Sequence, residues 1–143
     1  MTIRQITIAE ARSWIRTPYH HQAALTGVDC DCLGLVCGVW RGVYGADPEH
    51  RPAAFSRDCA ETLRDETLAE AASRHMISLA LDAFEPCDLL LFAINNNAPA
   101  EHRAILVAAD RMILATESHS VAEVSLVPWW HNRLRFVFRF PGI

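Results

Sequence analysis

The sequence lacks a long apolar run, an excess of positive charge, and any repeated or low-complexity segment. Its 143 residues carry a formal net charge of −4, which gives no electrostatic support for nucleic acid or an anionic membrane as a partner. The N-terminal Met1–Thr7 has no apolar signal core, and no later segment approaches the roughly eighteen apolar residues of a membrane span. We therefore expect synthesis in the cytosol and no membrane span.

The cysteines also lack the pattern of a disulfide framework or a zinc site. There are five of them, an odd number without a secretory signal, so reduced thiols are expected. The main chemical alternative is a metal held by Cys30 and Cys32 with His20 and His21. Structural zinc usually has about two to four residues inside each cysteine pair, and adjacent histidines cannot easily turn onto one ion. We expect no metal and no organic cofactor.

The sequence does contain one change of periodicity, from helical to strand-like. A hydrophobic fraction of 51% and a charged fraction of 21% fit one globular domain over residues 1–143. A capping box at Thr7–Glu10 predicts a first helix that stops before Thr17. A second helix is predicted from Cys32 to near Gly45, and a third over Asp58–His75.

From Cys87 onward the pattern predicts strands joined by short connections. The expected strands are Asp88–Ile94, His102–Ala108, Met112–Thr116, Val121–Val127 and Leu134–Phe140. Consecutive strands with short connections imply a mostly antiparallel, five-stranded sheet with the Cys32 helix packed on it. The predicted fold class is α+β.

Cys32 stands where the second helix is expected to begin. The unpaired N–H groups and positive dipole end there can lower a thiol pKa from about 8.5 toward roughly 3.5–7.5, which favours a nucleophile. Cys30 competes for this role because it also follows an aspartate. If Asp31 caps the helix, Cys32 lies in its first turn, and Gly34 permits close approach to the backbone. Cys32 is therefore the preferred candidate.

A histidine far downstream supplies a candidate partner for this thiol. His102 begins a predicted strand, and alternation places its ring on the side of small Ala104, which we expect to leave room against a helix. A helical cysteine paired with a histidine on a strand is the papain-like arrangement. An ordinary surface histidine is the alternative.

These segments resemble a known family. The stretches TPYHHQAALTGVDCDCLGLVCGVWRGVYG, PCDLLLF, AEHRAIL and the terminal VPWW…RFVFRFP resemble NlpC-type cell-wall peptidases, specifically the short versions encoded with phage tails and gene transfer agents. The resemblance implies a papain-like fold and a cysteine peptidase that cuts peptidoglycan stem peptides at the γ-D-glutamyl to diamino-acid bond. Cys32 would be the nucleophile and His102 the general base.

The resemblance implies further roles and one departure. Tyr19 would orient substrate or help hold the oxyanion, or else bridge a loop and the core. The family usually places a third polar residue, commonly histidine, where this chain has Leu114. Glu117, His119 or a main-chain carbonyl would then have to orient the ring of His102.

The remaining cysteines resemble buried thiols, because Cys37, Cys59 and Cys87 lie in or beside apolar segments. Cys87 is the second departure from the family pattern, which usually has glycine there. This difference predicts a local change of backbone.

The expected location follows from the resemblance. The protein would be carried in the tail of a phage-like particle, contact tail hub or baseplate proteins, and act on the periplasmic cell wall. The alternative is an inactive tail module that retains the fold, as Leu114 suggests. Its docking face would consist of exposed aromatic side chains, although Trp-Trp before a terminal strand is more often core. These side chains are Trp129, Trp130, Phe136, Phe138 and Phe140.

Overall fold

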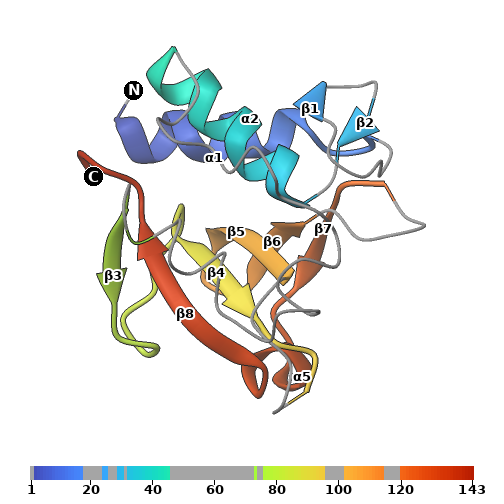
Figure 1. Ribbon diagram of the computed structural model, residues 1–143, viewed down its shortest axis with the longest axis vertical. Coiled ribbons are helices and arrows are strands. Elements are labelled where there is room, and N and C mark those ends of the chain that lie inside the picture. The colour runs from blue at the N-terminus through green and yellow to red at the C-terminus, as the bar shows by residue number, and fades with distance from the viewer. Residues whose placement is uncertain are drawn as a thin grey trace.

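Two helices lie over one face of a six-stranded sheet in the computed structural model of the chain (Figure 1). The structure describes residues 2–17, 24–25, 29–30, 32–45, 73, 76–95, 102–114 and 120–143. The two covering helices are α1 (Ile3–Ser13) and α2 (Cys32–Tyr44), and a one-turn helix, α5 (Pro128–His131), precedes the last strand. This architecture confirms the α+β fold class.

Helix α1 begins earlier than predicted. The hydroxyl of Thr2 accepts a hydrogen bond from the Gln5 N–H at 3.1 Å, and the Gln5 side chain accepts one from the Thr2 N–H at 2.8 Å. Thr7 lies inside the helix, where its hydroxyl donates to the carbonyl of Ile3 at 2.8 Å. The predicted capping box at Thr7–Glu10 is therefore wrong. Thr2 and Gln5 are also three residues apart, and they cap the free N–H groups one turn earlier in the chain.

Helix α2 has the predicted limits. It begins at Cys32 and ends before Gly45, whose φ of 81° is a conformation that favours glycine at a helix end. Leu35 and Val39 are buried against the sheet. A Cβ at Gly38 would overlap the indole of Trp14, so this glycine allows α1 and α2 to approach closely.

The sheet has the strand order β3-β8-β4-β5-β6-β7, and each of its strand pairs is antiparallel. Five of these strands correspond to predicted ones, and β3 is the additional strand. A three-residue edge strand is too short to show alternation. The sequence therefore predicted five strands, whereas the sheet has six. The bounds are β3 (Ile77–Leu79), β4 (Leu89–Phe92), β5 (His102–Ala108), β6 (Arg111–Leu114), β7 (Ala122–Ser125) and β8 (Leu134–Arg139).

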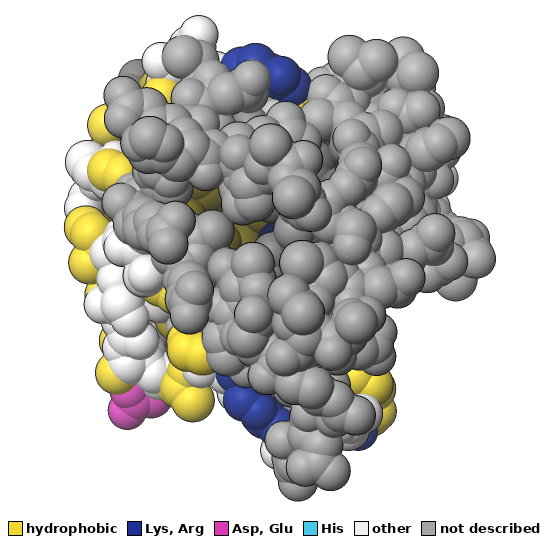
Figure 2. All heavy atoms as spheres, viewed as in Figure 1, with side chains coloured by type: hydrophobic (Ala, Val, Ile, Leu, Met, Phe, Trp, Pro, Cys, Tyr) yellow, Lys and Arg dark blue, Asp and Glu magenta, His cyan; other side chains and the backbone are white. Residues whose placement is uncertain are grey.

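The β3 edge of the sheet exposes apolar side chains. Ile77 is 50% exposed, and Leu81 in the following turn is 47% exposed. Figure 2 shows hydrophobic side chains along this edge of the molecule. A short edge strand limits the unpaired backbone that such a border presents.

Each face of the sheet carries its own apolar cluster. On the helix side, Ile105 and Val107 of β5 pack with Leu35 and Val39 of α2. On the opposite side, residues of the central strands pack with partly buried Trp130 of α5. This second cluster includes Leu90, Phe92, Ala104, Leu106, Met112 and Leu114. Alternation along β5 therefore turns its odd-numbered residues toward the helices.

The C-terminal phenylalanines do not form an exposed face. Phe138 and Phe140 are buried in the cluster beneath the helices, and Phe136 is partly buried beside them. The prediction that all three belong to an exposed docking face is wrong. The alternating pattern of β8 places Phe136 and Phe138 against the same packed layer.

A buried ion pair joins the start of β4 to the end of β8. Asp88 is 0% exposed and accepts hydrogen bonds from Nε and Nη2 of Arg139 at 2.9 and 2.8 Å. Asp88 also accepts the N–H of Glu85 at 2.8 Å, while the Glu85 carboxylate receives Arg4 Nη2 at 3.2 Å. The bond to Asp88 raises the pKa of Arg139. We call Arg4, Glu85, Asp88 and Arg139 the anchored end of the sheet.

Nothing in the described part of the chain resembles a membrane-spanning helix, because none of its helices is both long enough and apolar enough. The predicted third helix over Asp58–His75 lies outside the described residues except for Ser73, which is helical.

Candidate active site

Cys32 is the first residue of α2. A two-stranded antiparallel hairpin, β1 (Ala24–Leu25) and β2 (Asp29–Cys30), directly precedes the helix and pairs Cys30 with Ala24. The backbone of Cys32 therefore has the helix-start position that can stabilise a thiolate. The side chains of Cys30 and Cys32, and the whole of Asp31, lie outside the described residues.

His102 is the first residue of β5 and lies opposite Phe92 of β4. Its side chain is partly buried. The neighbouring Ala104 belongs to the cluster on the face away from α1 and α2, so the expectation that it leaves room against a helix is wrong.

Leu114 lies beside this histidine. It pairs with Ala104 across β5 and β6 and is 5% exposed in the cluster that contains Ala104. It is consequently a diagonal neighbour of His102, at a typical separation of about 7–8 Å. An aliphatic side chain there can accept no imidazole N–H. The other groups assigned to orienting or oxyanion roles, Glu117, His119 and Tyr19, lie outside the described residues.

A buried arginine follows the candidate histidine. Arg103 is 3% exposed and pairs with Leu91 on the helix-facing side of the sheet, where Ile105 and Val107 continue the same face. A buried guanidinium requires hydrogen-bond or charge partners, and Arg103 is not without an interaction in the structure. Sequence reasoning missed this residue, although its position in phase with two apolar residues of β5 was a visible signal.

Cys87 is unsuited to nucleophilic chemistry. It is fully buried, and burial raises the pKa of its thiol from 9.0 to about 11. The prediction of a buried, inert thiol is confirmed for this residue. Its φ is 88°, which is the left-handed region that glycine favours. The chain therefore places cysteine in a glycine-type conformation, and the local change of backbone relative to the family stays a prediction.

The described residues contain no group of three or more histidine, cysteine, aspartate or glutamate side chains able to hold a metal. The candidate ligands His20, His21, Cys30 and Cys32 lack described side chains. The absence of a metal and of any cofactor remains a prediction.

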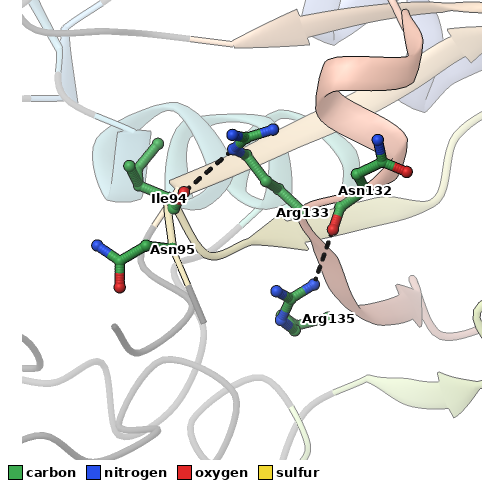
Figure 3. A pocket seen from close by; sticks show the side chains of 5 residues that line it. All are labelled: Ile94, Asn95, Asn132, Arg133 and Arg135. Carbon is green, nitrogen blue, oxygen red and sulfur yellow. Dashed lines mark hydrogen bonds between the residues drawn. The ribbon is translucent and has the colours of Figure 1, made fainter. Parts of the chain in front are cut away.

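A hollow of about 390 Å³ lies at the same end of the sheet as His102. Phe92 pairs with His102 on one side and with Leu134 on the other, and the hollow lies just beyond this row. Two strand spacings separate Leu134 from His102, a distance of about 10 Å. Figure 3 shows the lining side chains around the space: Ile94, Asn95, Asn132, Arg133 and Arg135.

The adjacent tryptophans have different environments. Trp130 packs against Phe92 with ring centroids 4.8 Å apart, whereas Trp129 is 46% exposed. The guanidinium of Arg133 lies 3.7 Å from the centre of the Trp129 ring. The core prediction therefore fits Trp130, and the surface alternative fits Trp129.

Comparisons with known proteins identify the fold. No protein-family model matches the sequence, and no curated protein matches it. The chain superimposes on the NlpC/p60 domain of the peptidoglycan hydrolase SagA with a TM-score of 0.67 and 20% identity, covering 96% of this chain and 98% of that domain. RipD from Mycobacterium tuberculosis, described as a non-catalytic NlpC/p60 domain protein adapted to peptidoglycan binding, gives a TM-score of 0.64 and 13% identity over 97% and 98% of the two chains.

A third similar structure is a lipoprotein-like protein of the NLP/P60 family from Staphylococcus aureus, with a TM-score of 0.64 and 18% identity. The match covers 96% of this chain but spans 41% of that protein. At these identities the likeness establishes the fold, which is that of NlpC/p60 domains. Such domains include both peptidoglycan hydrolases and a non-catalytic member.

Proposed function

We propose that this chain is a cysteine endopeptidase that cuts an amide bond in the stem peptides of peptidoglycan. The observation that carries the proposal is the position of Cys32 as the first residue of α2 within an NlpC/p60 fold. A helix start is where a cysteine thiolate is most readily stabilised. Cys87, the thiol whose environment is described, is buried and has a raised pKa.

The mechanism follows the chemistry of thiol hydrolases. The Cys32 thiolate attacks the amide carbon, and backbone N–H groups stabilise the oxyanion, with Tyr19 as a candidate helper. Protonated His102 gives its proton to the leaving amine as the C–N bond breaks and the thioester forms. Neutral His102 then takes a proton from water as the water oxygen attacks the acyl carbon, and the C–S bond breaks to release the carboxylic acid product and regenerate the Cys32 thiolate beside protonated His102. No metal or cofactor enters these steps.

We further propose which peptidoglycan bond is cut and which particle carries the enzyme. The bond is the γ-D-glutamyl to diamino-acid linkage, and the enzyme travels in the tail of a phage or gene transfer agent particle to open the periplasmic cell wall. Tail hub or baseplate proteins are its partners. The resemblance of the segments around Cys32 and His102 to short tail-encoded peptidases supports this setting.

A second candidate function is a peptidoglycan-binding or tail-structural module without activity. Leu114 favours it, because this buried aliphatic residue lies where an orienting polar residue would serve His102. The non-catalytic RipD provides an example of the fold without catalysis. In this case the described surface near Trp129 would still contact the cell wall or a tail protein.

Digestion of purified muropeptides, followed by mass spectrometry of the products, tests the proposal. Cys32→Ala is expected to lower turnover by about 10⁴-fold or more, because removal of the nucleophile leaves only binding and oxyanion contributions. Cys30→Ala is the matched control and retains most activity. The opposite ranking would assign the nucleophile to Cys30. Wild-type protein that cuts no muropeptide, alone or in its assembled particle, would favour the non-catalytic module.

A further inference from the structure

The hollow beside β8 has the composition of an anion site. Among the described residues, its lining combines two arginines with two asparagines and one aliphatic residue, and none of these residues carries a carboxylate. Arg133 and Arg135 flank the space from the turn after α5 and from β8, while Ile94 and Asn95 approach from the end of β4 (Figure 3). These segments are far apart in the sequence, so the fold assembles the hollow.

Arg133 is held in place by groups that leave its charge uncancelled. Its Nε donates to the carbonyl of Ile94 at 3.0 Å, and its Nη1 donates to the carbonyl of Trp129 at 2.8 Å. The exposed ring of Trp129 supports the guanidinium plane from one side. Among the described residues, no carboxylate pairs with Arg133, and its Nη2 donates to none of them. A guanidinium fixed in this way loses little conformational entropy when it binds an anion.

We propose that this hollow is a subsite for a free carboxylate of the peptidoglycan stem peptide, with Arg133 as its main ligand and Arg135 as a second positive charge. The inference rests on the proposed function, which places the scissile amide near His102. A γ-linked glutamyl residue keeps its α-carboxylate free, and the diamino acid contributes another carboxylate. A peptide that extends from His102 across the Phe92 row reaches the hollow after about 10 Å.

The remaining lining fits a peptide rather than a bare anion. The side-chain amides of Asn95 and Asn132 can donate to peptide carbonyls and accept from peptide N–H groups. Trp129 offers an exposed flat surface beside the charge. Charge-assisted contacts from arginine to a carboxylate are among the stronger hydrogen bonds in proteins.

The test measures binding without turnover. A Cys30→Ala/Cys32→Ala double variant is titrated by calorimetry with a γ-D-glutamyl-diamino-acid peptide, and then with the same peptide in which the carboxylates are carboxamides. We expect the carboxylate form to bind about tenfold or more tightly at low salt. Added Arg133→Gln should remove most of this preference, and Arg133→Lys should restore part of it. Inorganic phosphate should compete weakly, at concentrations well above those of the peptide.

Two controls keep the result specific. Arg111→Gln removes an arginine at the other end of the sheet and should leave the preference intact. Thermal melts exclude misfolding, and Arg135→Gln, which should also weaken the preference, serves if Arg133→Gln does not fold. Three outcomes would overturn the proposed subsite. They are equal affinity for both peptides, absence of binding, and a carboxylate preference that survives in Arg133→Gln and Arg135→Gln.

The outcome is separable from that of the proposed function. Cleavage of muropeptides by the wild type without any carboxylate preference would leave the peptidase and remove the subsite. A carboxylate preference that depends on Arg133, in a wild-type protein that cuts nothing, would leave the subsite and replace the peptidase with a binding module.

Discussion

The two ends of the sheet use arginine in different ways. At the anchored end, Arg139 is paired with buried Asp88, and Arg4 with Glu85. At the end that carries His102, Arg133 instead bonds to main-chain carbonyls and stacks on Trp129. A guanidinium neutralised by a carboxylate stabilises the fold, whereas one held by neutral groups keeps its charge for a ligand. The comparison separates the residues expected to control stability from those expected to control binding.

The largest effect on stability is expected at the anchored end. Asp88→Ala leaves Arg139 without its bidentate partner and should lower the free energy of unfolding by about 3–5 kcal/mol, as breaking a buried ion pair does. Urea denaturation measures the loss. Asp88 hydrogen-bonds through its carbonyl to Leu106, about 13 Å along β5 from His102. Muropeptide turnover per folded molecule should therefore not change, and a parallel fall in turnover would show that the ends are coupled.

The next largest effect is expected at the His102 end of the sheet. Leu114→His places a polar ring in a buried cluster, which costs about 1–3 kcal/mol unless it pairs with His102. If the wild-type ring is poorly oriented, this variant should raise kcat with little change in KM, because orientation acts on the chemical step. Leu114→Met is the matched apolar control. A fast wild type that is slowed by Leu114→His would show that another group already orients His102.

A smaller effect concerns the strained cysteine at the anchored end. The thiol pKa of Cys87 is raised from 9.0 to about 11, so the folded state disfavours ionisation. The contribution of this protonated thiol to the free energy of unfolding is fully present below pH 9 and is lost as the pH rises through 11. The stability of wild type relative to Cys87→Ala should fall by about 1.4 kcal/mol between pH 7.5 and pH 10. A difference independent of pH in urea denaturation would contradict the raised pKa.

The smallest effect is expected for a partly exposed ion pair. Glu123 receives Arg12 at 3.2 Å and Arg111 at 3.1 Å, and the hydrogen bond from Arg111 lowers its pKa. Glu123→Gln should cost less than about 1 kcal/mol at pH 7. Because the folded-state pKa is lowered, this contribution is present above the ordinary pKa of glutamate and disappears as the pH falls through the lowered value. Denaturation at pH 7 and below pH 4 should show the loss, and a cost as large as that of Asp88→Ala would contradict the distinction between buried and surface pairs.

The sequence allowed accurate prediction where local pattern and packing agree. The strand His102–Ala108 has its predicted limits, because turn residues bound an apolar run that is buried between two layers. Helix α2 likewise begins at Cys32 and ends before Gly45, since an apolar stripe and a terminal glycine mark it. These two elements carry the residues predicted as nucleophile and general base, so the sequence allowed prediction of the elements on which the candidate site lies.

The remaining features depend on contacts between distant segments. The β3 strand exists because β8 pairs with it, and its three residues have no pattern of their own. The face of β5 that meets α2 was assigned wrongly. Alternation shows which residues of a strand share a face, but it does not show which face a helix covers. The hollow near Arg133 requires the end of β4 to meet the turn before β8, which no local signal in either segment reports.

The strand order also constrains how the chain can be made. β8 is the last strand in sequence, yet it lies between β3 and β4 in the sheet. During synthesis, β3 must wait for Leu134–Arg139 to leave the ribosome before it gains its neighbour, whereas β4, β5, β6 and β7 can pair in the order in which they emerge. Late insertion of one strand next to a central one makes the sheet dependent on non-local contacts, which slow folding. A fragment that stops before Leu134 would expose the β4 edge that β8 covers and would present it to other chains.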